Sequence, residues 1–464
     1  GSNTTSFTGT LDGNGHDISG LAIDRTENNL SAPVGLFTRV GSSARIEDVD
    51  FRDVSIAANR SAGSHGFESD NFFGVGALAG NSSGTVRNIS VSGRVSGAHD
   101  VGGLIGISGG SVSNVSSSDT VIGSNSAGGL IGTIRAGTVA DVTLRDPRVI
   151  VNRSEPNDPG ELLRGNGGLA GRLYSGGDVE SVAADVNVTV NRSVIANHSE
   201  GYYVGGLVGV SRGSIEDVSV SGRVRGNAEV GSVVGRQTGR GTGIITDATS
   251  DATVRGIGDI GGIVGGMFAG KITNVSTDGY IDGYPYDGVD QVQSEAGGLG
   301  GVVGEVVGGT VRNASSSATI NASYSSSAGG LVGGNGGTLV DVSASGYVNA
   351  TPSTSVPTIN EDVGGLAGTN SGTIRNASAT GRVDGAFGDT RSRGTNRVGG
   401  LVGDNSGTIR NATATGRVSG SDNVGGLAGE SSGAIRIATA RGDVNASRYR
   451  VGGLVGLYDP DSAS

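Results

Sequence analysis

The sequence predicts an all-β protein, a single-stranded, right-handed parallel β-solenoid (β-helix) of about 14 coils with three short strands per coil. Three observations predict it: glycine makes up 90 of 464 residues, only 8 residues are proline, and one glycine-rich pattern recurs along the chain. Low proline and the lack of a three-residue period exclude a collagen-like chain. Val, Leu, Ile and Ala recur at regular places, so each repeat has apolar surface to bury against its neighbours.

The repeat unit is clearest in residues 398–420, VGGLVGDNSGTIRNATATGRVSG. We take the leucine of its GGLVG motif as an anchor. The shortest anchor spacing is 26 residues, as from Leu78 to Leu104 and from Leu104 to Leu130, and longer spacings indicate insertions. A 26-residue unit is therefore the building block. The anchors are Leu36, Leu78, Leu104, Leu130, Leu169, Leu207, Val233, Ile263, Leu299, Leu331, Leu366, Leu401, Leu427 and Leu454.

Three short apolar segments lie in each unit, and in the quoted copy they are residues 400–402, 408–412 and 417–419. Segments this short, bounded by Gly, Asn or Asp, indicate strands and not helices. We expect the glycines to supply positive φ at the turns. The adjacent Leu401 and Val402 leave one question open. Either a bulge turns both toward the core, or one aliphatic row lies outside under a covering loop.

We expect three parts: an N-terminal capping coil (1–33), the solenoid with loop insertions along one edge (34–457) and a C-terminal tail (458–464). The insertions lie at about residues 57–74, 149–165, 187–203, 282–296, 321–327, 349–362 and 385–397. The fourteenth coil has only its first strand. Because unpaired strand edges invite another chain to add on, we expect end-to-end self-association, as in a filament, or docking to another surface protein.

Charge and composition exclude several classes of protein. The net charge is −11, from 33 basic and 44 acidic residues, and Lys271 is the only lysine. An acidic chain without a basic stripe is not expected to bind nucleic acid. Such acidity fits a halophilic organism, with genomic GC bias as the alternative. The sequence has no run of 18 apolar residues, so we expect no membrane span, and the lack of cysteine excludes disulfides and thiol catalysis.

The repeated pattern GGLVG…NSGTIRNATATGRVSG resembles the GLUG repeat of bacterial and archaeal surface proteins. The opening FTGTLDGNGHDISGL (7–21), followed by VGLFTRVGSSARIEDVDF (34–51), resembles the coil that precedes such arrays. The resemblance covers almost the whole chain. It implies a secreted, surface-associated parallel β-solenoid, and it transfers no catalytic residue.

The third residue of the second strand is Asn or Asp in eleven coils. One interpretation is a ladder of carboxylates that binds cations. Neutral Asn replaces Asp freely here, which a metal ladder would not tolerate, so we interpret the row as a structural Asx stack at a turn. Its members are Asp48, Asn88, Asn114, Asp141, Asp217, Asp247, Asn274, Asn313, Asp341, Asn376 and Asn411.

Sequons of the form Asn-x-Ser/Thr are numerous. Six of them coincide with the Asx stack, and we expect those asparagines to be buried and unmodified. Six others lie in polar insertions and are candidate N-glycosylation sites, with chance in a chain rich in Asn, Ser and Thr as the alternative. The six candidates are Asn59, Asn152, Asn191, Asn197, Asn321 and Asn349.

Five tyrosines at the edge that carries the insertions are candidate contacts to a partner protein or a glycan, because tyrosine gives a large contact area at low entropic cost. The alternative is that the rings cover hydrophobic rows of the solenoid itself. The five are Tyr202, Tyr203, Tyr284, Tyr286 and Tyr324.

No compact pair of acids with a basic partner shares a register, so we predict no catalytic, cofactor-binding or metal-binding residue. Apart from N-linked glycans and loosely bound cations, we expect no cofactor. The first functional hypothesis is an extracellular, non-catalytic structural or adhesive surface protein: a stalk, an adhesin segment or a filament subunit. The alternative is a polysaccharide-binding or polysaccharide-cleaving β-helix, such as a virus tailspike.

Overall fold

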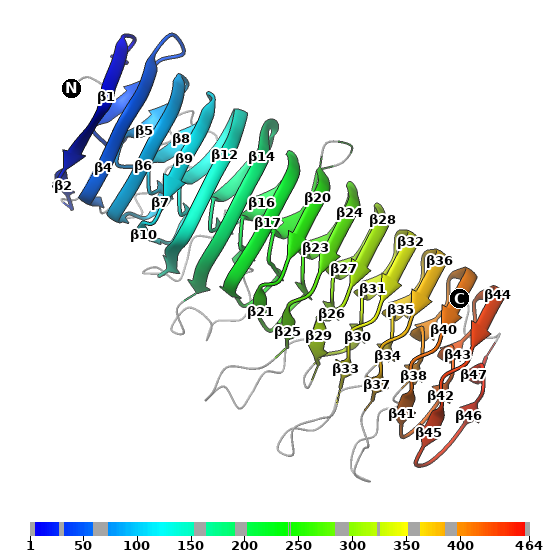
Figure 1. Cartoon of the computed structure of the whole chain (residues 1–464). Helices are drawn as coiled ribbons and strands as arrows, with labels where there is room; N and C mark the ends of the chain where they lie inside the picture. The colour runs from blue at the N-terminus through cyan, green and yellow to red at the C-terminus, as the bar shows by residue number, and fades with distance from the viewer. Residues whose placement is uncertain are drawn as a thin grey trace. The chain divides into compact units, whose positions relative to one another are not determined.

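The computed structural model describes residues 5–26, 32–58, 73–152, 164–190, 202–239, 241, 243–283, 297–322, 325–350, 362–385 and 397–459. None of these residues lies in a helix, and the strands among them pair in parallel (Figure 1). The chain divides into two compact units. Unit 1 comprises residues 1–225 with 242–244, and unit 2 comprises residues 226–241 with 245–464. The predicted all-β parallel solenoid is confirmed in each unit.

Unit 1 is a stack of coils in which each strand pairs with its counterpart one coil further on. The long strands are β1 (Thr10–Ser19), β4 (Arg45–Ala58), β6 (Thr85–Ser96), β9 (Val112–Ser117), β12 (Ile131–Val151), β14 (Ala170–Val190) and β17 (Ser214–Arg225). The post-leucine strands, which follow the anchor, are β3 (Phe37–Val40), β5 (Ala79–Ser82), β8 (Ile105–Ser108) and β16 (Val208–Ser211), and β12 and β14 begin in the same row.

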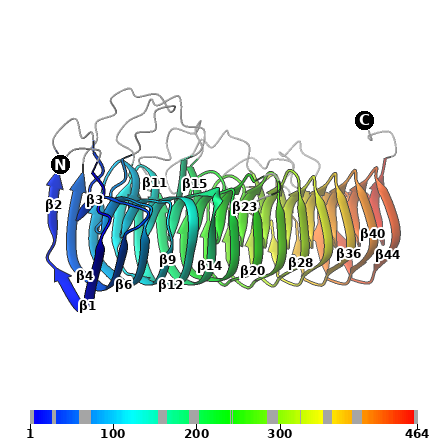
Figure 2. The same cartoon turned by 90° about the horizontal axis from the view of Figure 1, so that it is seen from above.

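Two further series complete unit 1. The pre-glycine strands, which end at the Gly–Gly pair, are β7 (His99–Gly102), β11 (Asn125–Gly128), β13 (Arg164–Gly167) and β15 (Tyr202–Gly205). The closing strands are the last segment of each coil. Two of them, β2 (Ala22–Arg25) and β10 (Thr120–Gly123), are separate from the long strand of their coil. In other coils, such as those of β4 and β12, the long strand itself continues into the row of closing strands. Figure 2 shows β11 and β15 on the opposite side of the unit from β4 and β6.

Unit 2 repeats the same four series with shorter strands. The long strands are β20 (Ile244–Ser250), β24 (Lys271–Thr277), β28 (Thr310–Ser316), β32 (Thr338–Ala344), β36 (Thr373–Ala379), β40 (Thr408–Ala414) and β44 (Ala434–Ala440). The post-leucine strands are β19 (Val234–Gln237), β23 (Val264–Met267), β27 (Val303–Val306), β31 (Val332–Asn335), β35 (Ala367–Asn370), β39 (Val402–Asn405), β43 (Ala428–Ser431) and β47 (Val455–Tyr458).

The other two series of unit 2 are shorter still. The pre-glycine strands are β18 (Val230–Gly231), β22 (Ile260–Gly261), β26 (Gly298–Gly300), β30 (Ser327–Gly329), β34 (Asp362–Gly364), β38 (Arg397–Gly399), β42 (Val424–Gly425) and β46 (Val451–Gly452). The closing strands are β21 (Thr253–Arg255), β25 (Tyr280–Asp282), β29 (Thr319–Asn321), β33 (Val348–Asn349), β37 (Val383–Asp384), β41 (Val418–Gly420) and β45 (Val444–Ala446).

The predicted number of strands per coil needs correction in unit 2, where each full coil has four strand segments and not three; in unit 1 some of these segments are continuous, as in β12 and β14. The additional segment is the pre-glycine strand, in which Val398 pairs with Val424 one coil further on. A two- or three-residue segment is too short to show the alternation that identifies a strand in a sequence. The anchor Leu299 is also wrong: it pairs with Ile260 in the pre-glycine row, and Val302 occupies the anchor position.

The question about the adjacent aliphatic residues is answered by a bulge. Leu401 and Val402 are both fully buried, and their amides both donate to the carbonyl oxygen of Leu427, at 2.8 and 3.0 Å. When two residues share one partner, the usual alternation is interrupted and both side chains can face the core. Leu104 with Ile105 shares the carbonyl of Leu130 in the same way.

Glycines such as Gly137, Gly270 and Gly309 have the positive φ expected of turn glycines, but Gly399, Gly400 and Gly403 of the GGLVG motif do not. These residues are glycine for steric reasons. A Cβ on Gly399 would lie 1.9 Å from the carbonyl oxygen of Val402, and one on Gly403 would lie 2.5 Å from the backbone nitrogen of Val363. Post-leucine and pre-glycine strands therefore pack backbone against backbone, with no room for a side chain between them.

Candidate functional site

Each long strand is kinked at a residue in the left-handed region, and the eleven predicted Asx residues lie at this position; β4 and β12 contain a second such residue, Asp53 and Asp146. The φ angles of the eleven residues run from +50° at Asn313 to +58° at Asp341, a region that Asn and Asp tolerate better than most other residues. The kink adds one residue that points outward, so Ile409 and Ala412 on either side both face the core. Ser181 and Ile437 lie at the same kink in two further coils.

Side-chain hydrogen bonds join nine of these residues into three runs. In each run an asparagine Nδ2 donates to the Oδ1 one coil earlier, at distances of 2.8–3.0 Å. The runs are Asp48–Asn88–Asn114 in unit 1, and Asp247–Asn274–Asn313 and Asp341–Asn376–Asn411 in unit 2. Each begins with Asp because a carboxylate accepts hydrogen bonds but has no proton to donate.

The sequon asparagines of the Asx stack are exposed, which corrects the expectation that they are buried. The reason is the kink, which turns the extra side chain toward solvent. The exposed residues are Asn88, Asn114, Asn274, Asn313, Asn376 and Asn411. Among the glycosylation candidates, Asn152, Asn321 and Asn349 are half-buried, and Nδ2 of Asn321 donates to Asp282 at 2.9 Å. Asn59, Asn191 and Asn197 lie outside the described residues.

The tyrosine candidates are only partly within the described chain. Tyr203 is 8% exposed, so its ring cannot serve as an open contact surface. Tyr202 lies in β15, where its backbone pairs with Arg164. Tyr284, Tyr286 and Tyr324 lie outside the described residues.

A tyrosine–carboxylate cluster on the closing strands was not predicted. Tyr347 Oη donates to Asp384 Oδ2 at 2.6 Å, and Arg382 Nε donates to Asp384 Oδ1 at 2.9 Å. The pKa of Tyr347 is raised to about 12, mainly by burial and to a smaller extent by the neighbouring carboxylate of Asp384. Burial alone would raise the pKa of Asp384, but hydrogen bonds from Ser419, Tyr347 and Arg382 outweigh it and lower that pKa. No sequence signal links Tyr347 to Asp384, because they lie in adjacent coils.

A second cluster places one arginine among three carboxylates. Arg397 Nε lies 2.5 Å from Asp362 Oδ1, and its Nη1 lies 3.1 Å from Asp404 Oδ2 and 3.8 Å from Glu430 Oε2. Asn423 donates to Glu430 at 3.1 Å. Burial raises the pKa of Asp362 to about 6, against the opposing effect of Arg397. Because the carboxylates already share this cation, we interpret the cluster as a structural one that joins neighbouring coils.

The third polar cluster centres on Glu229, whose carboxylate binds the guanidinium of Arg236 at 2.8–2.9 Å. The guanidinium carbon of Arg236 also lies 4.3 Å from the centre of the Phe268 ring. Nearby, the pKa of Glu305 is raised to about 7, mainly by burial and to a smaller extent by repulsion from Asp259.

Among the described residues, no three His, Cys, Asp or Glu side chains are grouped so that they could hold a metal ion.

A buried asparagine ladder was also missed. Asn335 donates to Asn370 at 2.7 Å, Asn370 donates to Asn405 at 2.7 Å, and Asn405 donates to Ser431 at 3.0 Å. Each is at most 2% exposed. The sequence signal was present, since each of the last three post-leucine strands before β47 ends in Asn or Ser followed closely by Gly. A polar residue at a strand end is, however, read as part of a turn unless its neighbours one coil away are known.

Stacked parallel coils with polar ladders define a parallel β-solenoid. Residues 200–225, 359–384 and 394–419 match the GLUG motif, which confirms the resemblance predicted from the repeat. The chain is also 37% identical over 95 residues to halomucin from Haloquadratum walsbyi, a match that covers 20% of this chain and 1% of halomucin. No solved structure matches the chain. Among the described residues there is no helix that could cross a membrane.

Proposed function

We propose that the chain is an extracellular, non-catalytic segment of a surface protein from a salt-adapted microorganism, with a structural or adhesive role. The observation that carries the proposal is the GLUG-type solenoid, in which the Asx runs and the buried asparagine ladder bind neighbouring coils to one another. The similarity to a segment of halomucin and the acidic, lysine-poor composition support the surface role and the salt adaptation.

The architecture suits this role physically. Each added coil brings its own backbone hydrogen bonds and its own ladder rungs, so a solenoid lengthens without needing a larger core. Every anchor and long strand then repeats the same contacts with the coil before it. A stalk, an adhesin segment or a filament subunit would each use this property.

Protease treatment of intact producing cells, followed by mass spectrometry of the released peptides, tests the proposal. We expect peptides from this chain to be released before any cytoplasmic marker protein. Intact-mass measurement of the same material reports attached glycans. Peptides released only after lysis would refute the surface location, and sugar release from any polysaccharide by the purified chain would refute the non-catalytic role.

A further inference from the structure

Three arginines stack on consecutive coils of unit 2. Arg375 in β36 is in register with Arg410 in β40, which is in register with Arg436 in β44. All three side chains are exposed, and none of them forms an ion pair with a described residue. We call these three residues the arginine row. The row is a stack of positive charges in a chain whose net charge is −11.

The arginine row is electrostatically unfavourable by itself. Equivalent residues on neighbouring coils are about 4.8 Å apart, and like charges directly opposite each other destabilise a sheet. Arginines elsewhere in the same row of the long strands have carboxylate partners: Arg87 binds Glu47, and Arg312 lies 3.2 Å from Asp341. A structural role accounts for those two residues, but it does not account for the three arginines of the row.

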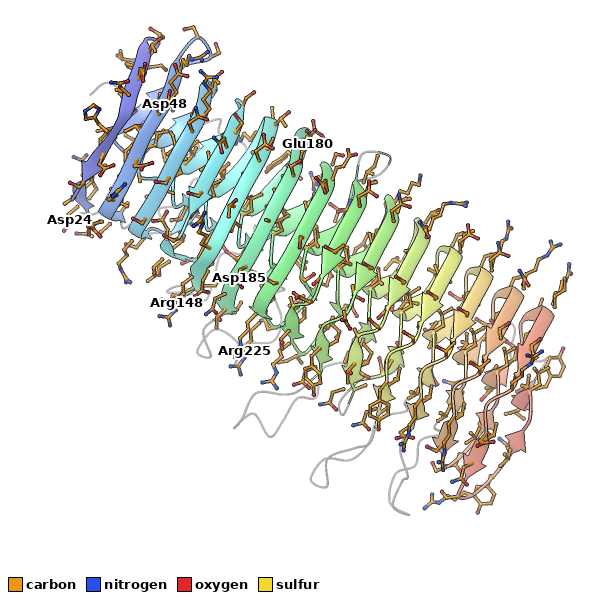
Figure 3. All side chains as sticks on the ribbon, in the orientation of Figure 1. Asp24, Asp48, Arg148, Glu180, Asp185 and Arg225 are labelled. Carbon is orange, nitrogen blue, oxygen red and sulfur yellow. The ribbon has the colours of Figure 1, made fainter. Side chains whose placement is uncertain are left out.

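The surroundings of the row are polar on β36 and β40, whereas on β44 the exposed Ile437 stands beside Arg436. On β40, Arg410 is followed by the exposed Asn411 and Thr413, and Thr413 is in register with Ser378 and Thr439 on the coils before and after. Each coil thus presents a guanidinium and a hydroxyl on one outer face, and two of the three add an amide. Nitrogen-tipped side chains project from this part of unit 2 in Figure 3.

The surrounding sequence is also basic. Residues 367–450 contain eleven arginines and six acidic residues, a net charge of +5 within a chain of net charge −11. The expectation of a chain without a basic stripe is therefore wrong for this stretch. A field of one sign over several coils attracts polyanions.

We propose that the arginine row binds a linear acidic polysaccharide, with one carboxylate or sulfate group facing each coil. Guanidinium groups bind such anions through two parallel hydrogen bonds, and the neighbouring amides and hydroxyls suit sugar hydroxyl groups. The coil spacing of about 4.8 Å is the repeat that the anionic groups of such a ligand would have to match. The three strands contain no aromatic residue, which disfavours single-stranded nucleic acid, because its bases need stacking partners.

This inference adds a ligand class to the proposed surface role, and its test does not depend on where the protein is located. The probe is polygalacturonate, measured against the purified full chain by biolayer interferometry at about 0.1 M ionic strength, where screening is moderate. Methyl-esterified polygalacturonate keeps the sugars and removes the charges. The test variant is Arg375→Gln/Arg410→Gln/Arg436→Gln. The matched control is Arg145→Gln/Arg148→Gln/Arg223→Gln, which removes three exposed arginines of unit 1 that do not stack on consecutive coils.

We expect the chain to bind polygalacturonate, the test variant to bind it at least tenfold more weakly, and the control to stay within threefold of the unchanged protein. Circular dichroism and mass must match across the three proteins, and a row variant with Lys in place of Arg should regain part of the affinity if the loss is due to charge. Equal losses in test and control, equal binding of the methyl ester, or tighter binding of single-stranded DNA would each overturn the proposal. So would loss of binding that follows only a change in self-association.

Discussion

Asp119 is a buried carboxylate whose ionisation should set the pH dependence of unit 1. The residue is 0% exposed, and its Oδ1 has no hydrogen-bond partner among the described residues. Its Oδ2 has one weak contact, 3.5 Å from Ser117 Oγ. Because burial penalises the charged form, the pKa of Asp119 rises to about 7, with Ser117 opposing the change only slightly.

The direction and size of the effect follow from linkage. The folded chain holds the Asp119 proton more tightly than the unfolded chain, whose pKa is near 3.8. The stabilising effect of that proton is complete below pH 3.8 and is lost as the pH rises through about 7. One pKa unit corresponds to about 1.4 kcal/mol, so the loss in unfolding free energy approaches about 4 kcal/mol above pH 7.

The substitution Asp119→Asn removes this titration and keeps the shape of the side chain. We expect the variant to exceed the unchanged protein in unfolding free energy by up to about 4 kcal/mol at pH 8, and the difference to vanish near pH 4. Urea denaturation at both pH values, with hydrogen exchange of peptides covering 112–123 to localise the effect, measures it. The control is Asp185→Asn, at an exposed residue of β14 (Figure 3). Equal pH slopes for Asp119→Asn and the unchanged protein would refute the reasoning.

Three further predictions concern the coils themselves. Ile409→Asp places an unpaired charge at a fully buried position and should reduce the unfolding free energy by about 3–5 kcal/mol or prevent folding. Asp404→Ala, at a half-exposed residue, should reduce it by less than about 1 kcal/mol. Chemical denaturation measures both, and similar midpoints would mean that the inward face is misassigned. Asn88→Asp removes a ladder donor and faces Asp48 with a like charge, so we expect a loss of about 1–2 kcal/mol that shrinks in high salt, and a salt-independent loss would contradict this. Gly403→Ala should reduce the unfolding free energy by about 2 kcal/mol or more and lower the melting temperature accordingly, because the new Cβ would meet backbone atoms. An unchanged melting temperature would show that the strands can move apart.

The sequence predicted what depends on the period and missed what depends on neighbouring coils. The 26-residue spacing was sufficient for the coils, and the alternation around Ile409 was sufficient for the inward face. The bulge at Leu401 and Val402 could not be chosen, because it depends on two amides sharing a carbonyl one coil away. The steric role of Gly403 could not be predicted for a similar reason. A glycine that makes room for another strand looks the same in a sequence as one that allows positive φ.

The candidate site shows the same limit. The positions of the Asx row followed from register alone, but their exposure did not, because the kink that turns Asn411 outward is visible only in the backbone. The Tyr347–Asp384 contact joins residues 37 apart in sequence. Since insertions vary in length, no fixed spacing marks such a pair. Clusters of this kind can be predicted only after the coils have been aligned with one another.

The Asx ladders also show how sequence order determines which coils are linked by side chains. Asparagine both donates and accepts, so it can continue a run in either unit, whereas aspartate only accepts and must begin one. Asp141 therefore cannot continue the run that ends at Asn114, and Asp341 cannot continue the run that ends at Asn313. The side chain of Ile437, at φ +56° and 71% exposed, can neither donate nor accept a hydrogen bond at this position. The Oδ1 of Asn411 therefore accepts no side-chain hydrogen bond from this residue of the next coil. The surface chemistry of each coil is thus determined by its neighbour, and changing one rung alters the hydrogen bonding of two coils.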